Sequence, residues 1–246
     1  MKLIFWLALL LVGWGSSSPA DEIQVAVASN FAPAVRQLAS RFEKETGHQV
    51  KLSFGSTGKQ YAQILHGAPF HAWFAADAYR PMRLEEAGRI VPGSRFTYAR
   101  GRLVLWSPQL GLVDDEGEVL RRGDFRHLAL ANPRLAPYGL AARQVLEKLG
   151  LWQILQNRLV RGENIGQTYQ FVKTGNAELG LVAASQVLDR SRTEKGSFWL
   201  LPADLHGPIE QQAVLLRDEE AARAFLAFAA SEAGRAIIRA NGYEVP

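Results

Sequence analysis

The 246-residue sequence contains no cysteine. This absence excludes disulfides, thiolate nucleophiles and thiolate metal sites, and it also excludes the lipid-modified cysteine that would tether a secreted lipoprotein. Repeats, low-complexity tracts and Pro- or Gly-rich linkers are absent as well. The chain must therefore rely on a conventional hydrophobic core, and its 48% of hydrophobic residues suffice for one large or two modest domains.

Long apolar runs are missing too, except at the N-terminus. There Lys2 precedes an apolar stretch over residues 3–12, and small residues lead up to Ala20. This pattern predicts a secretory signal peptide over residues 1–20, cleaved before Asp21. An uncleaved membrane anchor is disfavoured because the stretch is shorter than the roughly 20 residues that span a bilayer. We therefore expect a periplasmic protein that is not a lipoprotein.

Charge of one sign is not in large excess. The 28 Lys and Arg residues and 24 Asp and Glu residues give a net charge of +4, spread along the chain, which does not indicate nucleic-acid binding. The histidines are also scattered, and none has a metal-ligand spacing such as H-E-x-x-H. Neither a metal-dependent hydrolase nor a cation site is predicted from these five residues, His48, His66, His71, His127 and His206.

The sequence does contain a succession of strand, turn and helix patterns. Residues 23–29, 50–54 and 72–75 are predicted strands, each followed by a turn and a helical pattern. The chain is thus expected to be α/β, with mostly parallel sheets flanked by helices. Further strands are predicted at 102–106, 128–131, 179–183 and 212–216, and helices at 139–149, 168–173 and 219–241, with a possible break at Gly234.

Small polar residues follow the first two predicted strands. Ser29 and Asn30 end the first strand and Ser56 and Thr57 end the second, and each pair opens a helix. Ligands of open α/β sheets bind outside the carboxyl ends of the strands, and a helix N-terminus there offers unpaired N–H groups to an anion. These side chains are also good helix caps, worth about 1 kcal/mol each. The residues alone leave both roles open.

Several short segments recur in an order and spacing that identify a family. They lie at 27–31, 54–58, 67–69, 75–77, 132–133, 136–139, 162–165 and 175–180. With these segments the chain resembles the molybdate-binding proteins of ABC transporters along nearly its whole mature length. The resemblance implies a two-lobed type II periplasmic solute-binding fold that closes on molybdate or tungstate in the interlobe cleft. It also implies a monomer without a cofactor, which delivers the anion to a membrane permease.

The lobes are expected to be formed by residues 21–101 with 208–246 and by residues 102–207, joined by crossing strands. By the same resemblance, Tyr138 matches a tyrosine whose hydroxyl reaches the anion in one branch of the family. Ile165 matches a position that contributes a backbone N–H. Carried over in full, the family's ligand positions fall on Ser29, Asn30, Ser56, Thr57, Ala136, Tyr138 and Ile165.

The sequence departs from the family at two places. Ala183 and Ala184 stand where another branch has a ligand tyrosine, and His71 stands where an acidic residue often follows Ala-Pro-Phe. We interpret His71 as a surface residue, or else as a pH-sensitive residue on the cleft rim. Glu163 is the one acidic residue in the four proposed turns. Phosphate, which carries a proton, is therefore disfavoured if Glu163 points away from the site.

Two alternatives compete with this function. The same fold could bind sulfate, another oxyanion or a small organic anion. An exported serine acyltransferase or β-lactamase is more remote: 56–59 fits S-x-x-K and 173–175 fits K-T-G, but no S-D-N lies between them. The K-T-G is expected to end a helix with Gly175 as its C-terminal cap, whereas the enzymes need it on a strand. We therefore predict that the chain is not an enzyme.

Overall fold

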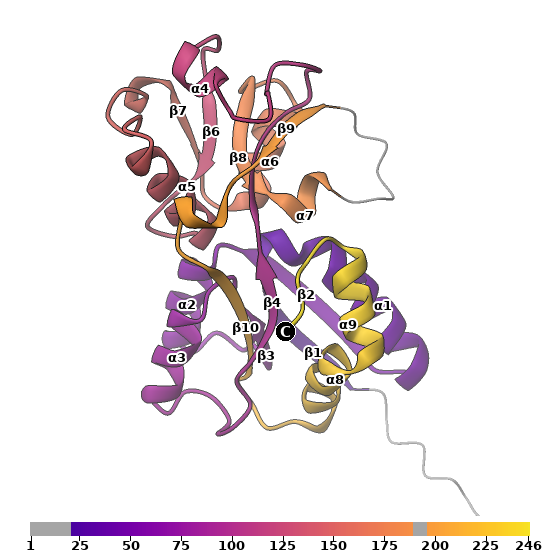
Figure 1. Cartoon of the computed structure of the whole chain (residues 1–246). Helices are drawn as coiled ribbons and strands as arrows, with labels where there is room; N and C mark the ends of the chain where they lie inside the picture. The colour runs from indigo at the N-terminus through magenta and orange to yellow at the C-terminus, as the bar shows by residue number, and fades with distance from the viewer. Residues whose placement is uncertain (1–20, 189–195) are drawn as a thin grey trace, which may run out of the picture.

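A computed structural model describes residues 21–188 and 196–246, so the predicted signal peptide lies outside the described residues. The chain forms two lobes, each built on a five-stranded sheet (Figure 1). The chain crosses from the first lobe to the second between β4 and β5 and returns to the first lobe at β10 (Figure 1). The predicted α/β class with two lobes is confirmed.

The sheet of the first lobe combines parallel and antiparallel strands. Strand β1 pairs in parallel with β2 and β3, whereas β10 runs antiparallel to β3 and β4. The order across the sheet is β2 (Gln49–Gly55), β1 (Glu22–Ala28), β3 (Ala72–Phe74), β10 (Ile209–Leu215) and β4 (Phe96–Gly101).

The sheet of the second lobe repeats this plan. Strand β6 pairs in parallel with β7 and β8, and β5 runs antiparallel to β8 and β9. The order is β7 (Leu159–Gly162), β6 (Leu128–Ala131), β8 (Leu179–Ala183), β5 (Leu103–Ser107) and β9 (Ser197–Leu200). Both sheets are mixed because the successive βα units supply parallel strands, while β4, β5 and β10 follow the chain across the hinge and back.

Helices cover both faces of the first sheet, where buried side chains of α1 and α8 pack on one face and those of α2 and α3 on the other. This lobe contains α1 (Ala32–Thr46), preceded by the 3-10 turn η1 (Ser29–Phe31), α2 (Thr57–Leu65), α3 (Tyr79–Glu86), α8 (Glu220–Ala230) and α9 (Glu232–Ala240). The second lobe contains α4 (Val119–Arg122), α5 (Pro137–Lys148), α6 (Ile165–Lys173), α7 (Ala184–Val187), η2 (Gln156–Arg158) and η3 (Ala203–Leu205).

The break in the last predicted helix lies at Ser231, so the expected break at Gly234 is wrong. Ser231 has an extended backbone and caps α9, since its hydroxyl accepts the Gly234 N–H at 3.2 Å. Gly234 lies inside the first turn of α9, where a Cβ atom would overlap the carbonyl oxygen of Phe228. This glycine therefore serves close packing between α8 and α9 and does not end the helix.

The proposed lobe boundaries remain a prediction. They are supported by strand membership, because the first sheet takes residues 22–101 and 209–215 and the second takes residues 103–200. Only Arg102 separates β4 from β5, so the crossing there is short and has no flexible linker. Residues 189–195 fall outside the described part of the second lobe.

The Glu178 carboxylate ties the start of β8 to the loop before β6. Its Oε1 accepts from Arg126 Nε and its Oε2 from the His127 N–H, both at 2.9 Å. Burial raises the pKa of Glu178, but these hydrogen bonds outweigh it and lower the pKa to about 2. The folded-state pKa thus lies below the unfolded value, so this stabilisation is complete above about pH 4.5 and is lost as the pH falls toward 2.

We expect Glu178→Gln to lower the free energy of unfolding at pH 7 by about 1–2 kcal/mol, a value discounted because the Arg126 side chain is 83% exposed. Urea unfolding between pH 7 and pH 2.5 measures this. The difference between wild type and variant should shrink as the pH falls. Glu147→Gln, which breaks the exposed pair with Arg143, is the control and should cost below about 0.5 kcal/mol. A difference that does not change with pH would contradict this account.

Candidate functional site

A small cavity lies between the lobes, where strands of both sheets end. Its volume is about 10 Å³. It is lined by Ala28, Ser29, Asn30, Gly55, Ser56, Thr57, Ala76, Ala136, Pro137, Tyr138, Asn164 and Ile165. All seven residues that the sequence singled out are brought together in this lining, and the other five are their neighbours in the chain or Ala76, which follows β3. None of the described lining residues carries a charge.

Helices begin at the cavity from both lobes. The turn η1 begins at Ser29 and α2 at Thr57, while α5 begins at Pro137 and α6 at Ile165. The N–H groups in the first turn of a helix have no partner within that helix, and the helix dipole adds partial positive charge there. The cavity is thus surrounded by backbone donors without any basic side chain.

The hydroxyl groups in the lining do not serve as helix caps. Ser56 is the N-terminal cap residue of α2, yet its side chain makes no capping hydrogen bond. Thr57 Oγ1 accepts from the Ala76 N–H, and Ser29 Oγ accepts from the Gly166 N–H of the other lobe, each at 3.0 Å. Asn164, by contrast, caps α6 by accepting from Gln167. Because Ser29 and Thr57 already accept, their hydroxyl protons remain available to a ligand.

Two buried polar atoms of the lining have no hydrogen-bond partner within the described part of the chain. They are Ser56 Oγ and Asn30 Oδ1, and both residues are at least 98% buried. Leaving a buried polar group unpaired costs about 1–3 kcal/mol, so such groups in a native fold require an explanation. The Ser56 hydroxyl can donate to a ligand in the cavity, whereas Asn30 Oδ1 can only accept and would pair with an oxyanion's oxygens only if the amide turned its nitrogen toward the cavity.

Tyr138 connects the cavity wall to the hinge. Its hydroxyl accepts from Gln211 Nε2 at 3.3 Å and lies so close to Gly101 that a Cβ atom there would overlap it. Burial raises the pKa of this hydroxyl well above its usual value, so it stays protonated and can donate. The backbone N–H of Tyr138, in the first turn of α5, is a second donor near the cavity.

The sequence did not indicate the residues behind this wall. Asn30 Nδ2 donates to Gln211 Oε1 at 2.7 Å and to the Tyr243 hydroxyl at 3.0 Å. Gln211 lies one residue before the strand predicted at 212–216, and Tyr243 was given no role, but both lie against a predicted ligand residue. One signal was present: the consecutive residues Gln211 and Gln212 point to opposite faces of the sheet, and in a sheet covered on both faces each needs polar partners.

The lobes are in contact around the cavity, as in a closed binding protein. Lys59 Nζ lies 2.8 Å from Glu163 Oε1, and the Gly58 N–H donates to the Leu135 carbonyl at 2.8 Å. The Glu163 carboxylate is therefore engaged by Lys59 at a position that is nearly half exposed, and Glu163 is not among the residues that line the cavity. Glu163 thus points away from the cavity, which is the condition under which the sequence disfavours phosphate as the ligand.

The interpretation of His71 as a residue of the cleft rim is wrong, and at the surface His71 is half-buried. Its Nδ1 accepts from the Gln24 N–H at 2.8 Å, its Nε2 lies 3.2 Å from Glu219, and its side chain is only 12% exposed. His71 precedes β3, whereas Ala76 in the cavity wall follows β3. The imidazole is therefore covered, and it lies at the opposite end of the strand from the cleft.

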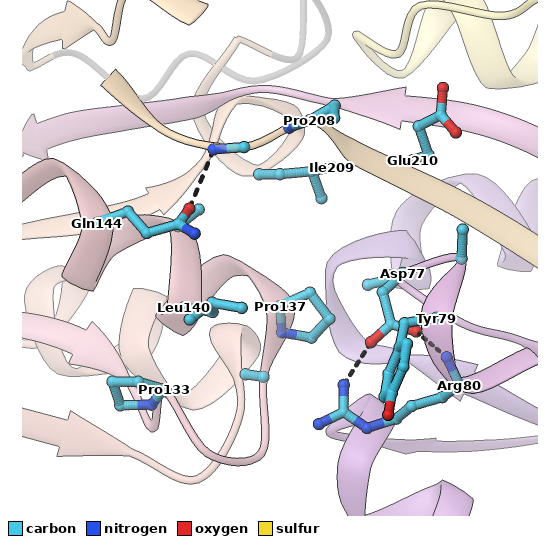
Figure 2. Close-up of a pocket in the computed structure, with 15 residues that line it drawn as sticks. Asp77, Tyr79, Arg80, Pro133, Pro137, Leu140, Gln144, Pro208, Ile209 and Glu210 are labelled. Carbon is cyan, nitrogen blue, oxygen red and sulfur yellow. Dashed lines mark hydrogen bonds and ion pairs between the residues drawn. The ribbon is translucent and has the colours of Figure 1, made fainter. Parts of the chain in front are cut away.

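A larger groove of about 470 Å³ lies beside the cavity and shares Ala76, Ala136 and Pro137 with it. Figure 2 shows apolar side chains such as Leu140 in its wall and the Asp77 carboxylate paired with Arg80. Burial raises the pKa of Asp77, against the lowering effect of Arg80. With this carboxylate and Glu210 in its lining, the groove is poorly suited to a dianion.

The serine-enzyme constellation is not formed. Helix α6 ends at Lys173 and Gly175 follows with a φ of 78°, so the K-T-G segment is a helix terminus as predicted. Lys59 pairs with Glu163 and not with Ser56. Among the residues described, no group of three or more His, Asp or Glu could hold a metal ion. No helix of residues 21–188 or 196–246 is long and apolar enough to cross a membrane.

A family model described as bacterial extracellular solute-binding protein matches residues 23–244. The chain belongs to this family. The solute-binding protein is 49% identical to the molybdate-binding protein ModA of Azotobacter vinelandii, over 97% of this chain and 98% of the relative. It is 46% identical to ModA of Rhodobacter capsulatus, over 95% of this chain and 92% of the relative.

A solved structure agrees with these sequence relatives. The periplasmic molybdate-binding protein of Azotobacter vinelandii matches the solute-binding protein with a TM-score of 0.88 and 44% identity, over 91% of this chain and 99% of that chain. Its fold is thus the two-lobed fold expected from the sequence. The relatives are binding proteins and not enzymes, as the sequence analysis predicted for this chain.

Proposed function

We propose that this solute-binding protein captures molybdate outside the cytoplasmic membrane and delivers it to the permease of an ABC importer, with tungstate as a second ligand. The observation that carries the proposal is the interlobe cavity whose described lining presents hydroxyl and N–H donors and no charged side chain. The names of the relatives, molybdate-binding proteins at 49% and 46% identity, support the same ligand.

The donor chemistry favours an anion that carries no proton. Molybdate, tungstate and sulfate are fully ionised at neutral pH, and their oxygens can only accept hydrogen bonds. Ser29 and Thr57 each use their hydroxyl oxygen to accept an N–H, which leaves the proton to be donated. Phosphate retains a proton near neutral pH and needs an acceptor carboxylate, which the described cavity wall lacks.

We assign the anion contacts as follows. The first lobe contributes Ser29, Asn30, Ser56 and Thr57, and the anion binds there first. Closure of the hinge then adds the Ile165 N–H and Tyr138, with Ala136 in the wall. The Gly166 N–H bond to Ser29 links the two lobes at the same point, so closure and presentation of donors are coupled. The predicted signal peptide, periplasmic location and monomeric state belong to this proposal.

Isothermal titration calorimetry of the chain from Asp21 onward, dialysed free of oxyanions, tests the function. We expect one-to-one binding of molybdate and tungstate, sulfate affinity at least 100-fold lower, and no heat from phosphate. The expected discrimination against sulfate rests on size, because its oxygens lie closer to the centre and cannot reach all the donors at once. Equal affinity for sulfate would make this an unselective oxyanion protein, and no heat from any of the four would point to an organic anion.

A further inference from the structure

Gln211 lies on the strand that returns from the second lobe and touches ligand residues of both lobes. Its side chain is fully buried on β10. Oε1 accepts from Asn30 of the first lobe at 2.7 Å, while Nε2 donates to the Tyr138 hydroxyl of the second lobe at 3.3 Å. Gln211 Oε1 also accepts from Tyr98 at 3.0 Å. One amide thus joins two predicted anion contacts across the hinge.

Gln211, its three partners and Tyr243 form a buried hydrogen-bond network, in which each amide has a fixed set of donor and acceptor contacts. One polar atom of this network has no partner in the described part of the chain. Asn30 Nδ2 uses both protons, on Gln211 Oε1 and on the Tyr243 hydroxyl. The amide oxygen of Asn30 is therefore left buried and without a partner in the cavity lining, within the residues described. An oxygen acceptor in that position would repel an anion.

The same side chains can form the network in the opposite direction. An amide presents its oxygen and its nitrogen at equivalent positions, so a half-turn of the Asn30 and Gln211 amides exchanges donors and acceptors. Gln211 Nε2 then donates to Asn30 Oδ1 and to the Tyr98 hydroxyl, which still donates to the Ala75 carbonyl. The Tyr243 hydroxyl must turn its proton from the Asn30 carbonyl to Asn30 Oδ1. The Tyr138 hydroxyl donates to Gln211 Oε1, so in this direction Tyr138 offers the anion its backbone N–H and not its hydroxyl proton. Asn30 Nδ2 now lies where the unpaired oxygen was.

The two directions suit two states of the cavity. Without an anion, reversal would leave an N–H donor unpaired, which is rarer in native proteins than an under-satisfied carbonyl oxygen. With an anion in the cavity, the reversed network pairs the Asn30 donor with it and removes the repelling oxygen. The reversed direction therefore suits a cavity that holds an anion.

We propose that Gln211 is the positioning residue of the anion site, which sets the direction of the buried network and thereby turns the N–H face of Asn30 toward a bound oxyanion. The inference rests on the proposed function, because it needs a dianion in the cavity. Gln211 itself does not touch the anion in this scheme. It acts through Asn30. Because Gln211 also bonds to Tyr138 of the second lobe, the choice of donor and acceptor in the network depends on closure of the lobes.

Calorimetric titration of molybdate into four proteins tests the proposal: wild type, Gln211→Met, Asn30→Ala and the double variant. We expect Gln211→Met to weaken binding about tenfold, because Asn30 then lacks the donor that holds its oxygen away from the anion. In the Asn30→Ala background the same change should cost less than twofold. Gln212→Met is the matched control, since Gln212 is the next residue on β10, also buried, and bonds to Arg95 and Thr97 away from the cavity.

A second variant, Gln211→Glu, keeps polar contacts that Gln211→Met removes, so it tests the proposal even if Gln211→Met does not fold. Gln211→Glu can still accept from Asn30 and Tyr98, and it keeps its contact with Tyr138 with the hydroxyl as donor, but it cannot donate to Asn30 Oδ1. We expect it to bind molybdate at least as weakly as Gln211→Met, and its loss should shrink in the Asn30→Ala background. A loss that persists there would reflect charge repulsion alone and would overturn the proposal.

The remaining outcomes are distinct. If Gln211→Met binds within twofold of wild type, or loses the same factor with and without Asn30, Gln211 is only a structural residue and the inference fails. If wild type binds no molybdate, the proposed function has failed. Thermal unfolding without molybdate should give similar midpoint shifts for Gln211→Met and Gln212→Met.

Discussion

Replacing Ser56 by aspartate is expected to lower molybdate affinity at least 1,000-fold while preserving the fold. Ser56 occupies the N-cap of α2 with extended φ and ψ of −81° and 144°, and aspartate is among the preferred residues there. The new carboxylate faces the cavity, where it meets a dianion. Like unit charges about 4 Å apart repel by about 4 kcal/mol at an effective dielectric constant of 20, and the dianion increases this penalty.

Titration calorimetry and thermal unfolding together check this prediction. Ser56→Asp should show no heat with molybdate at concentrations that saturate wild type, and its midpoint of unfolding without anion should be equal or higher. Ser56→Ala, which removes one donor without adding charge, is the control and should lose about tenfold. If Ser56→Asp retains affinity within tenfold of wild type, Ser56 does not face the anion.

Replacing Gly58 by valine is expected to weaken molybdate binding about 100-fold by preventing closure. A Cβ atom on Gly58 would lie 2.9 Å from the Leu135 carbonyl oxygen and 3.1 Å from its Cα atom. These atoms belong to the other lobe, and the Gly58 N–H already bonds to that oxygen at 2.8 Å. The clash therefore exists only when the lobes are closed, and the cost falls on the bound state.

Thermal unfolding with and without molybdate separates closure from folding. Without anion, Gly58→Val should unfold at the wild-type midpoint, because the residue lies in the first turn of α2 and packs against the other lobe. Adding 1 mM molybdate should raise the unfolding midpoint of wild type, and this rise should be largely absent in Gly58→Val. Ala62→Val adds the same side chain at an exposed position of α2 and should respond to molybdate as wild type does. An unchanged response of Gly58→Val would show that closure tolerates the added side chain.

Much of the fold was predictable because the parallel strands are local patterns. The strands around residues 25 and 73 contain continuous apolar runs, the strand around residue 52 alternates apolar and polar residues, and each is followed by a turn. Strands β4, β7 and β9 were not predicted. Strand β4 mixes polar and apolar residues, and β7 and β9 have four residues each at the edge of a sheet, so none shows a clear period.

The candidate site also contains residues that the sequence indicated and residues that it did not. Ser29, Asn30, Ser56 and Thr57 were found because a strand end and a helix start are both set by neighbouring residues. Gln211 and Tyr243 were not found as site residues, because Asn30 meets them across 181 and 213 positions of sequence. His71 was misplaced for a related reason, since its partner Glu219 comes from the start of α8.

The sequence by itself determined the class of the fold, the family and the polar turns at the strand ends, because each depends on residues close together in the chain. The tertiary structure decided which role those polar residues have. Ser29 and Thr57 accept N–H groups from Gly166 and Ala76, and Ser56 has no partner within the described residues, so none of the three caps the helix that it opens. That distinction depends on contacts between strand ends and between lobes, which local sequence does not encode.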